Sequence, residues 1–137
     1  MRLNKYLSKS GVASRREAEK LIQSALITIN GNVELSPHYN VKKNDIVKYD
    51  SMVVKDNQET IVIMLNKPAG YITSMKDPLN RKIVSDLINV KERVFPIGRL
   101  DKDTTGLLLF TNQGDLALKL SHPRFNIPKI YTLSIDR

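Results

Sequence analysis

The sequence of 137 residues contains no cysteine, only two histidines and no long apolar run. Without cysteine, the chain has no disulfide framework, no thiol nucleophile and no thiolate metal site. The two histidines, His38 and His122, leave little for a histidine-based metal cluster. No apolar run approaches the roughly 18 residues that a membrane helix needs, and the first residues contain no apolar signal stretch. We therefore expect a cytoplasmic protein that does not bind membranes.

Basic side chains outnumber acidic ones by 22 to 14, which gives a formal net charge of +8 and a pI near 9.8. The sharpest excess lies in residues 1–20, where only Glu17 and Glu19 are acidic. The basic residues of this cluster are Arg2, Lys5, Lys9, Arg15, Arg16 and Lys20. Such a cluster can be a solvated helix face. Its grouping on one side, within a chain of strong positive charge, favours a polyanion partner.

Local patterns predict two short helices at the start of the chain. Apolar residues at i, i+3 and i+4 from Leu3 have the spacing of one helix face. Gly11 is typical of the residue that follows a helix end. Ser14 and Glu17 fit a capping box, in which each side chain bonds the backbone of the other residue, so a second helix is expected to begin there.

A small sheet is expected to follow these helices and to complete a region of residues 1–50. Residues 27–29 favour a short strand, and Asn30–Gly31 predicts a two-residue hairpin turn. Val33 begins the return strand. Residues 41–47 are interpreted as a strand, a turn and a further strand.

The rest of the chain alternates apolar runs with polar loops. Residues 51–60 are mostly polar and are expected to form a linker with a short strand at 52–54. Beyond it we expect buried strands at 61–65 and 107–110, an extended segment at 94–101, short helices at 83–88 and 115–120, and a final alternating strand at 129–135. The predicted fold class is α+β, with a largely antiparallel sheet over residues 61–137. Because the last strand leaves an edge uncovered, we expect a piece of a larger domain.

The densest polar cluster spans Gly98–Gly106, between an extended segment and an apolar run. In an extended chain Arg99, Asp101 and Asp103 point to one side. The cluster can be a salt-bridged turn in which Asp103 or Thr104 caps backbone amides, or a carboxylate pair that binds Mg²⁺. The functional interpretation is that Asp101 acts as a nucleophile or base. Arg99 would keep it ionised and grip an RNA phosphate or base.

Two further segments are weaker candidates. Residues 66–71 form a loop with proline and glycine after an apolar strand, where loops often line sites, although structural punctuation is the plainer interpretation. Lys129 and Tyr131 share one face of the last predicted strand. Tyr131 is therefore either an amphipathic core residue or a ring that stacks on a nucleobase. His38 and His122 are interpreted as loop residues rather than general bases.

Three ordered motifs resemble those of the bacterial ribosomal-RNA pseudouridine synthases of the RsuA type: Leu65–Gly70, Gly98–Leu107 and Lys129–Tyr131. Residues 2–48 also resemble the S4 RNA-binding domain, notably at 2–7 and 11–18. The resemblance therefore implies a small S4-type domain at 1–50, a linker at 51–60, and the N-terminal portion of a pseudouridine synthase catalytic domain at 61–137. Family members continue into further sheet and an arginine-rich motif, so we expect this chain to be a truncated fragment.

The resemblance also implies roles for single residues. Asp101 would attack the target uridine at the uracil ring or the ribose; the base would then detach, rotate and rejoin the sugar through carbon. Arg99 would pair with Asp101 or fill the space left by the flipped base. Tyr131 would stack on uracil, and Lys129 would support the site electrostatically. The other substrate-binding candidates from these motifs are Asn66, Lys67 and Gly98.

The resemblance implies no metal and no organic cofactor, and its expected partner is ribosomal RNA or a ribosomal subunit precursor. The basic residues of segment 1–20 are then expected to contact phosphates. The sequence around Asp101 slightly favours large-subunit over small-subunit RNA. Two rival functions are a non-catalytic S4-type module for structured RNA and Mg²⁺-dependent nucleotide hydrolysis by Asp101 and Asp103. The intact Arg99, Asp101 and Tyr131 argue against a pure binding module.

Overall fold

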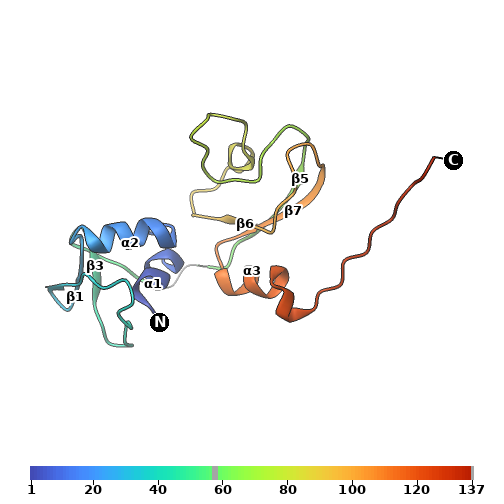
Figure 1. Ribbon diagram of the computed structural model, residues 1–137. Helices are drawn as coiled ribbons and strands as arrows, with labels where there is room; N and C mark the ends of the chain where they lie inside the picture. The colour runs from blue at the N-terminus through green and yellow to red at the C-terminus, as the bar shows by residue number, and fades with distance from the viewer. Residues whose placement is uncertain (57–58, 137) are drawn as a thin grey trace.

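The computed structural model describes residues 1–56 and 59–136. We call these two stretches the N-terminal region and the C-terminal region. Figure 1 shows the two regions side by side, with the end of the chain leading away from both. The N-terminal region contains α1 (Leu3–Lys9), α2 (Arg15–Gln23), β1 (Ile27–Ile29), β2 (Asn32–Val33), β3 (Val47–Tyr49) and β4 (Met52–Val53). The C-terminal region contains β5 (Val62–Lys67), the 3₁₀ helix η1 (Val84–Leu87), β6 (Phe95–Ile97), β7 (Gly106–Thr111), α3 (Gly114–Ser121) and the 3₁₀ helix η2 (Pro123–Phe125).

The two N-terminal helices form as the sequence predicts. Leu3 and Leu7 are fully buried on the inner face of α1, and Gly11 follows the helix end with a positive φ of 81°. The capping box at the start of α2 is confirmed, because Ser14 Oγ accepts from Glu17 N at 3.2 Å and Glu17 Oε2 accepts from Ser14 N at 3.1 Å. These local contacts fix where the helices end and which faces they bury.

The N-terminal sheet has the antiparallel order β2-β1-β3-β4. Its hairpin turn is confirmed, since Asn30 and Gly31 both have positive φ, as a tight two-residue turn requires. The strand predicted at the start of 41–47 is wrong, because β3 begins only at Val47. Asp45 explains the difference: its carboxylate accepts from the Lys42 backbone at 2.9 Å, which fixes a turn in place of a strand.

The N-terminal core continues into the stretch interpreted as a linker. There β4 pairs with β3, and Val54 packs in the same cluster as Leu7 and Ile22. The Tyr6 hydroxyl also donates to the Val54 backbone oxygen at 2.9 Å. The first compact unit therefore extends to Val54.

The C-terminal sheet is three-stranded and antiparallel, in the order β5-β7-β6. Its core is a small cluster of Val84, Val94, Leu108 and Phe110. The helices predicted at 83–88 and 115–120 are present as η1 and α3. In the described part of the chain no helix is long and apolar enough to cross a membrane.

The two strands predicted to be buried are buried on one face only. Leu108 and Phe110 are 2% and 0% exposed, whereas Leu107, beside them on β7, is 63% exposed. On β5, Met64 is 75% exposed while Lys67 is fully buried. Side chains alternate between the two faces of a strand, and the core elements of this region cover one of those faces. A continuous apolar run therefore did not indicate burial on both sides here.

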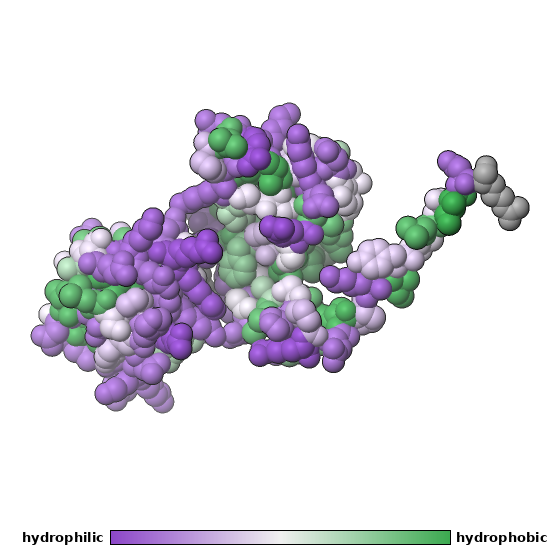
Figure 2. All heavy atoms as spheres, viewed as in Figure 1, coloured by the Kyte–Doolittle hydropathy of each residue, from purple (hydrophilic) through white to green (hydrophobic). Residues whose placement is uncertain are grey.

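The predicted final strand at 129–135 is wrong for this structure. Described residues after Phe125 belong to no helix or strand, and Ile130, Tyr131 and Leu133 are 92%, 79% and 81% exposed. Figure 2 shows apolar side chains along this extended tail. Alternation alone does not make a strand, because the backbone also needs a neighbouring strand to take its hydrogen bonds.

Candidate active site

The loop between β6 and β7 carries Arg99 and Asp101 and is fixed from beneath by a buried ammonium group. Lys67 is fully buried, and its Nζ donates to the backbone oxygens of Asp101 at 2.9 Å, Lys102 at 3.0 Å and Thr104 at 2.7 Å. A fourth acceptor is the Pro68 oxygen at 3.1 Å. An ammonium has three hydrogens, so they are shared among these oxygens. The ammonium therefore compensates for its burial by ordering the backbone of the loop.

Lys67 reaches this position because of the period of β5. Ile63, Leu65 and Lys67 alternate with the exposed residues of the strand and lie on its core side. Lys67 is also opposite Gly106 in the β5–β7 register, at the end of the loop. The family motif at 65–70 predicts a substrate-binding role for Lys67. In the structure its ammonium contacts the chain itself and is shielded from solvent.

Further hydrogen bonds tie the same loop to residues 70–73. Thr73 Oγ1 donates to the Leu100 oxygen at 2.7 Å and accepts from Leu100 N at 3.2 Å. Gly70 N donates to the Lys102 oxygen at 2.8 Å. The backbone on both sides of Asp101 is thus held in place, while Asp101 itself is exposed.

The polar cluster is a turn, in which Thr104 N donates to the Asp101 oxygen at 3.1 Å. No ion pair within 4.0 Å involves Arg99, Asp101 or Asp103 among residues 1–56 and 59–136. The expected pairing of Arg99 with Asp101 is therefore absent from this structure. In the same ranges no group of three or more His, Asp and Glu side chains could hold a metal ion.

A cavity of about 630 Å³ lies beside this loop. It is bordered by Gly98 and Arg99 from the loop, by Leu107 from β7 and by Lys129 from the tail. The ends of α3 and η2 complete its wall. The volume lies within the roughly 300–1,000 Å³ typical of sites for small molecules.

Besides the buried Lys67, three predicted catalytic or substrate-binding residues do not line this cavity. Asp101 lies two residues beyond Arg99, on the same loop but outside the lining. Asn66 is exposed on β5, where it lies opposite Leu107, a residue that lines the cavity. Tyr131 lies on the exposed tail. The structure therefore brings Gly98, Arg99 and Lys129 together and leaves Tyr131 apart from them.

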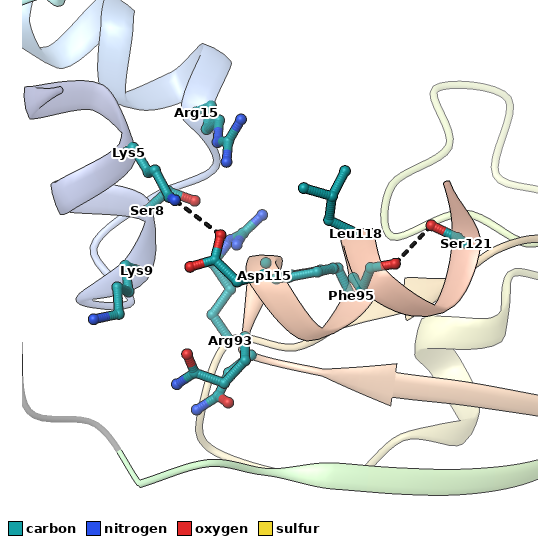
Figure 3. Close-up of a pocket in the computed structure, with 13 residues that line it drawn as sticks. Lys5, Ser8, Lys9, Arg15, Arg93, Phe95, Asp115, Leu118 and Ser121 are labelled. Carbon is teal, nitrogen blue, oxygen red and sulfur yellow. Dashed lines mark hydrogen bonds and ion pairs between the residues drawn. The ribbon is translucent and has the colours of Figure 1, made fainter. Parts of the chain in front are cut away.

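The basic residues of segment 1–20 fall into two groups. Lys5, Lys9 and Arg15 line a second cavity, between the two regions (Figure 3). The others are exposed and lie outside that lining: Arg2, Arg16 and Lys20. Within the first group, Lys5 pairs with Asp115 and Lys9 with Asp56, each at 2.9 Å.

Sequence reasoning missed two residues of this second cavity, Arg93 and Asp115. Arg93 stands in an ordinary charged stretch, and Asp115 fits the first turn of any helix. No local pattern therefore marked them. The pKa of the Asp115 carboxyl is held below its usual value, mainly by the hydrogen bond from Lys5.

The chain matches the family described as RNA pseudouridylate synthase over residues 61–136 and the S4 domain over residues 1–47. It is 45% identical to an uncharacterized RNA pseudouridine synthase of Aquifex aeolicus, over 99% of this chain and 55% of the relative. It is 41% identical to ribosomal large subunit pseudouridine synthase B of Bacillus subtilis, over 98% of this chain and 55% of the relative. It is 39% identical to the dual-specificity RNA pseudouridine synthase RluF of Escherichia coli K12, over 100% of this chain and 47% of the relative.

A crystal structure of a pseudouridylate synthase is 26% identical, with a TM-score of 0.49, over 90% of this chain and 54% of that one. The chain thus spans about half the length of the curated relatives it matches. The family match includes the loop of Arg99 and Asp101 and the strand of Lys67, and the S4 match includes α1 and α2. The chain therefore belongs to the RNA pseudouridylate synthase family and carries an S4 domain at its N-terminus.

Proposed function

We propose that the protein represented by this chain converts a uridine of ribosomal RNA to pseudouridine in the cytoplasm. Large-subunit RNA is the favoured substrate, since the relatives include a ribosomal large subunit enzyme. The observation that carries the proposal is the held loop beside the cavity of about 630 Å³. Lys67 and Thr73 fix the backbone around Asp101 and leave its carboxylate exposed. Such positioning is what a nucleophile needs.

In the proposed reaction Asp101 is the nucleophile. A stacked uridine must first leave its helix, at a cost of a few kcal/mol. The Asp101 carboxylate then attacks the uracil ring or the ribose, and the N1–C1′ bond breaks. After the base rotates, C5 bonds to C1′, the bond to the Asp101 carboxylate breaks to release the free carboxylate, and the C5 proton is transferred to N1, so uridine and product have the same atoms. Arg99, two residues away on the same loop, would fill the space left by the flipped base.

The other residues have supporting roles in this proposal. Lys129 lines the cavity with Arg99 and Gly98, where its positive charge faces the position of the substrate. Tyr131 would stack on the flipped uracil. That role requires the tail, on which Tyr131 is now 79% exposed, to fold back toward the cavity. Asn66, beside Leu107, would contact the substrate from β5.

The experiment compares Asp101→Asn with Asp103→Asn, a matched change in the same exposed turn. Carbodiimide mapping of pseudouridine on unmodified ribosomal RNA would be run with this chain and with the complete protein. We expect the complete protein to modify a uridine, Asp101→Asn to lose all modification, and Asp103→Asn to retain most of it. Modification by the Asp101→Asn variant would refute the role of the carboxylate. EDTA distinguishes the metal-dependent alternative, because only that reaction would stop.

A second candidate is a module that binds structured RNA without modifying it. The observation that favours it is the exposed position of Tyr131, away from Arg99. In that case the complete protein would bind ribosomal RNA, and no new pseudouridine would form. The mapping experiment therefore separates the two candidates.

A further inference from the structure

The cavity between the two regions has a strongly basic lining. Its volume is about 450 Å³. Lys5, Lys9 and Arg15 border it from the N-terminal region, and Arg93, just before β6, borders it from the C-terminal region (Figure 3). Asp115 at the start of α3 is the acidic member of the lining. Four cations and one carboxylate line the cavity, and Asp56 outside the lining pairs with Lys9. The net charge of these groups is +2, so the cavity attracts anions.

The Asp115 carboxylate already occupies the position of an anion. It accepts from Lys5 Nζ at 2.9 Å across the two regions. Lys5 lowers the pKa of this carboxyl most, and the charges of Lys9 and Arg15 add to the effect. Both partners of the pair are partly open to water, with side chains 35% and 66% exposed. An exposed pair of this kind is weak and can be displaced.

The two arginines of the cavity have no such partner. Among the described residues, neither Arg15 nor Arg93 lies within 4.0 Å of a carboxylate. Arg93 is half-buried, and its guanidinium lies 5.7 Å from the centre of the Phe95 ring. Burial lowers the pKa of Arg93. A partly desolvated guanidinium with free donors is suited to a phosphate, which it can bind through two parallel hydrogen bonds.

We propose that this cavity binds a backbone phosphate of the RNA substrate, and that Asp115 is an internal competitor which the phosphate displaces from Lys5. The inference rests on the proposed function for its RNA substrate. The arrangement of the cations favours RNA over a small free anion. The cations come from both regions. The N-terminal region matches the S4 domain, and the C-terminal region matches the RNA pseudouridylate synthase family. A phosphodiester chain can pass from one region to the other, so the site would couple RNA capture to the placement of the loop.

The test measures binding of a fluorescein-labelled fragment of unmodified large-subunit ribosomal RNA by anisotropy, over a series of salt concentrations. Arg93→Gln removes a cation of the cavity. Arg124→Gln removes an exposed arginine that does not line it. We expect Arg93→Gln to weaken binding about tenfold, as the loss of a charge-assisted hydrogen bond does. The slope of log Kd against log salt should fall by about one. Arg124→Gln should change Kd less than about twofold.

Asp115→Asn gives a result that misfolding could not produce. Removal of the internal competitor should tighten RNA binding by about threefold or more, since Lys5 becomes available to a phosphate. Asp50→Asn is the matched control, because Asp50 is exposed in the β3–β4 turn, outside the cavity. It makes the same change in net charge. Arg93→Lys should recover part of the affinity, since the charge remains and the fork of donors is lost.

Two outcomes would overturn the inference. One is equal binding by Arg93→Gln and Arg124→Gln. The other is Asp115→Asn binding no tighter than Asp50→Asn. Neither would touch the proposed function, which depends on the loss of pseudouridine in Asp101→Asn. Conversely, a complete protein that binds RNA through Arg93 without modifying it would uphold this site and refute the proposed reaction.

Discussion

The two regions of the molecule are held together by different kinds of contact. In the described residues, the N-terminal region buries a cluster of nine apolar residues, from Leu3 to Val54. The C-terminal region buries a cluster of four, Val84, Val94, Leu108 and Phe110. Its sheet also has an open face, where Met64 is 75% exposed. Because apolar burial is the main favourable term in folding, the C-terminal region depends more on its other contacts.

Those other contacts are polar and lie at both ends of β5. Lys67 is bonded to four backbone oxygens of its surroundings. At the far end of the same strand, buried Asn112 accepts from Ile61 N at 3.0 Å and donates to the Glu59 oxygen at 2.7 Å. Buried polar networks of this kind fix one arrangement when every member is satisfied. The comparison indicates that apolar packing shapes the S4 part, whereas hydrogen bonds to backbone oxygens position the loop of Asp101.

The largest expected effect would separate the two cores. Phe110→Ala removes a fully buried ring from the smaller cluster and should cost about 3–5 kcal/mol. Amide exchange followed by NMR should then show lost protection in β5 and β7, with protection in β1 and α2 retained. Ile22→Ala in the larger cluster is the mirror control. Equal loss of protection in both regions would show that they unfold as one unit, with no separate stability for each core.

A second prediction concerns the ammonium beneath the loop. Lys67→Met keeps the length of the side chain and removes the ammonium that donates to the oxygens of Asp101, Lys102 and Thr104. The first two oxygens keep a backbone amide donor, whereas the Thr104 oxygen loses its donor. We expect a loss of about 2–3 kcal/mol, as for hydrogen bonds to a charged group. The Thr104 amide, which bonds Asp101, should exchange faster.

The control for this change is Lys102→Met, since Lys102 is exposed in the same loop. It should leave both the urea midpoint and the exchange of Thr104 nearly unchanged. If Lys67→Met were as stable as the control, the polar contacts would not position the loop, and the contrast between the regions would rest on core size alone.

Much of the N-terminal region could be predicted because its signals are local. The capping box of Ser14 and Glu17 and the turn at Asn30–Gly31 need only a few residues of context. In the C-terminal region, the strands and α3 were also readable from local patterns. The burial of Lys67 could have been found by counting, since it shares its side of β5 with Ile63 and Leu65.

The rest could not be predicted, because it depends on contacts far apart in the chain. The alternating residues of 129–135 have the pattern of a strand, but a strand forms only beside a partner that no local pattern supplies. The cavity between the regions joins Lys5 to Asp115, which are 110 residues apart. Neither residue type nor spacing marks Arg93 as a neighbour of Arg15.

The smallest expected effect concerns a pair that links the two regions. Glu17 forms an ion pair with Lys76. The hydrogen bond from Lys76 lowers the pKa of the Glu17 carboxyl most, and hydrogen bonds with the Ser14 backbone and side chain add to the effect. Together they lower this pKa from 4.5 to about 2. A carboxyl with a lowered pKa in the folded state stabilises the protein above its unfolded pKa. That contribution is lost as the pH falls from about 4.5 through about 2. Lys76 is 81% exposed, so the pair should contribute at most about 1 kcal/mol.

Urea unfolding of Glu17→Gln against the parent chain, repeated across that pH range, would measure this contribution. The two should differ most above about pH 4.5 and converge toward about pH 2. Glu92→Gln, a change at an exposed glutamate, should follow the parent throughout. At low pH the parent chain loses the attraction between Glu17 and Lys76, because the carboxyl is protonated. High salt screens the same attraction, so it should also reduce the difference in stability between the two chains. A difference that ignored salt would place the effect in the capping box at Ser14, within the N-terminal region, rather than in the link between the regions.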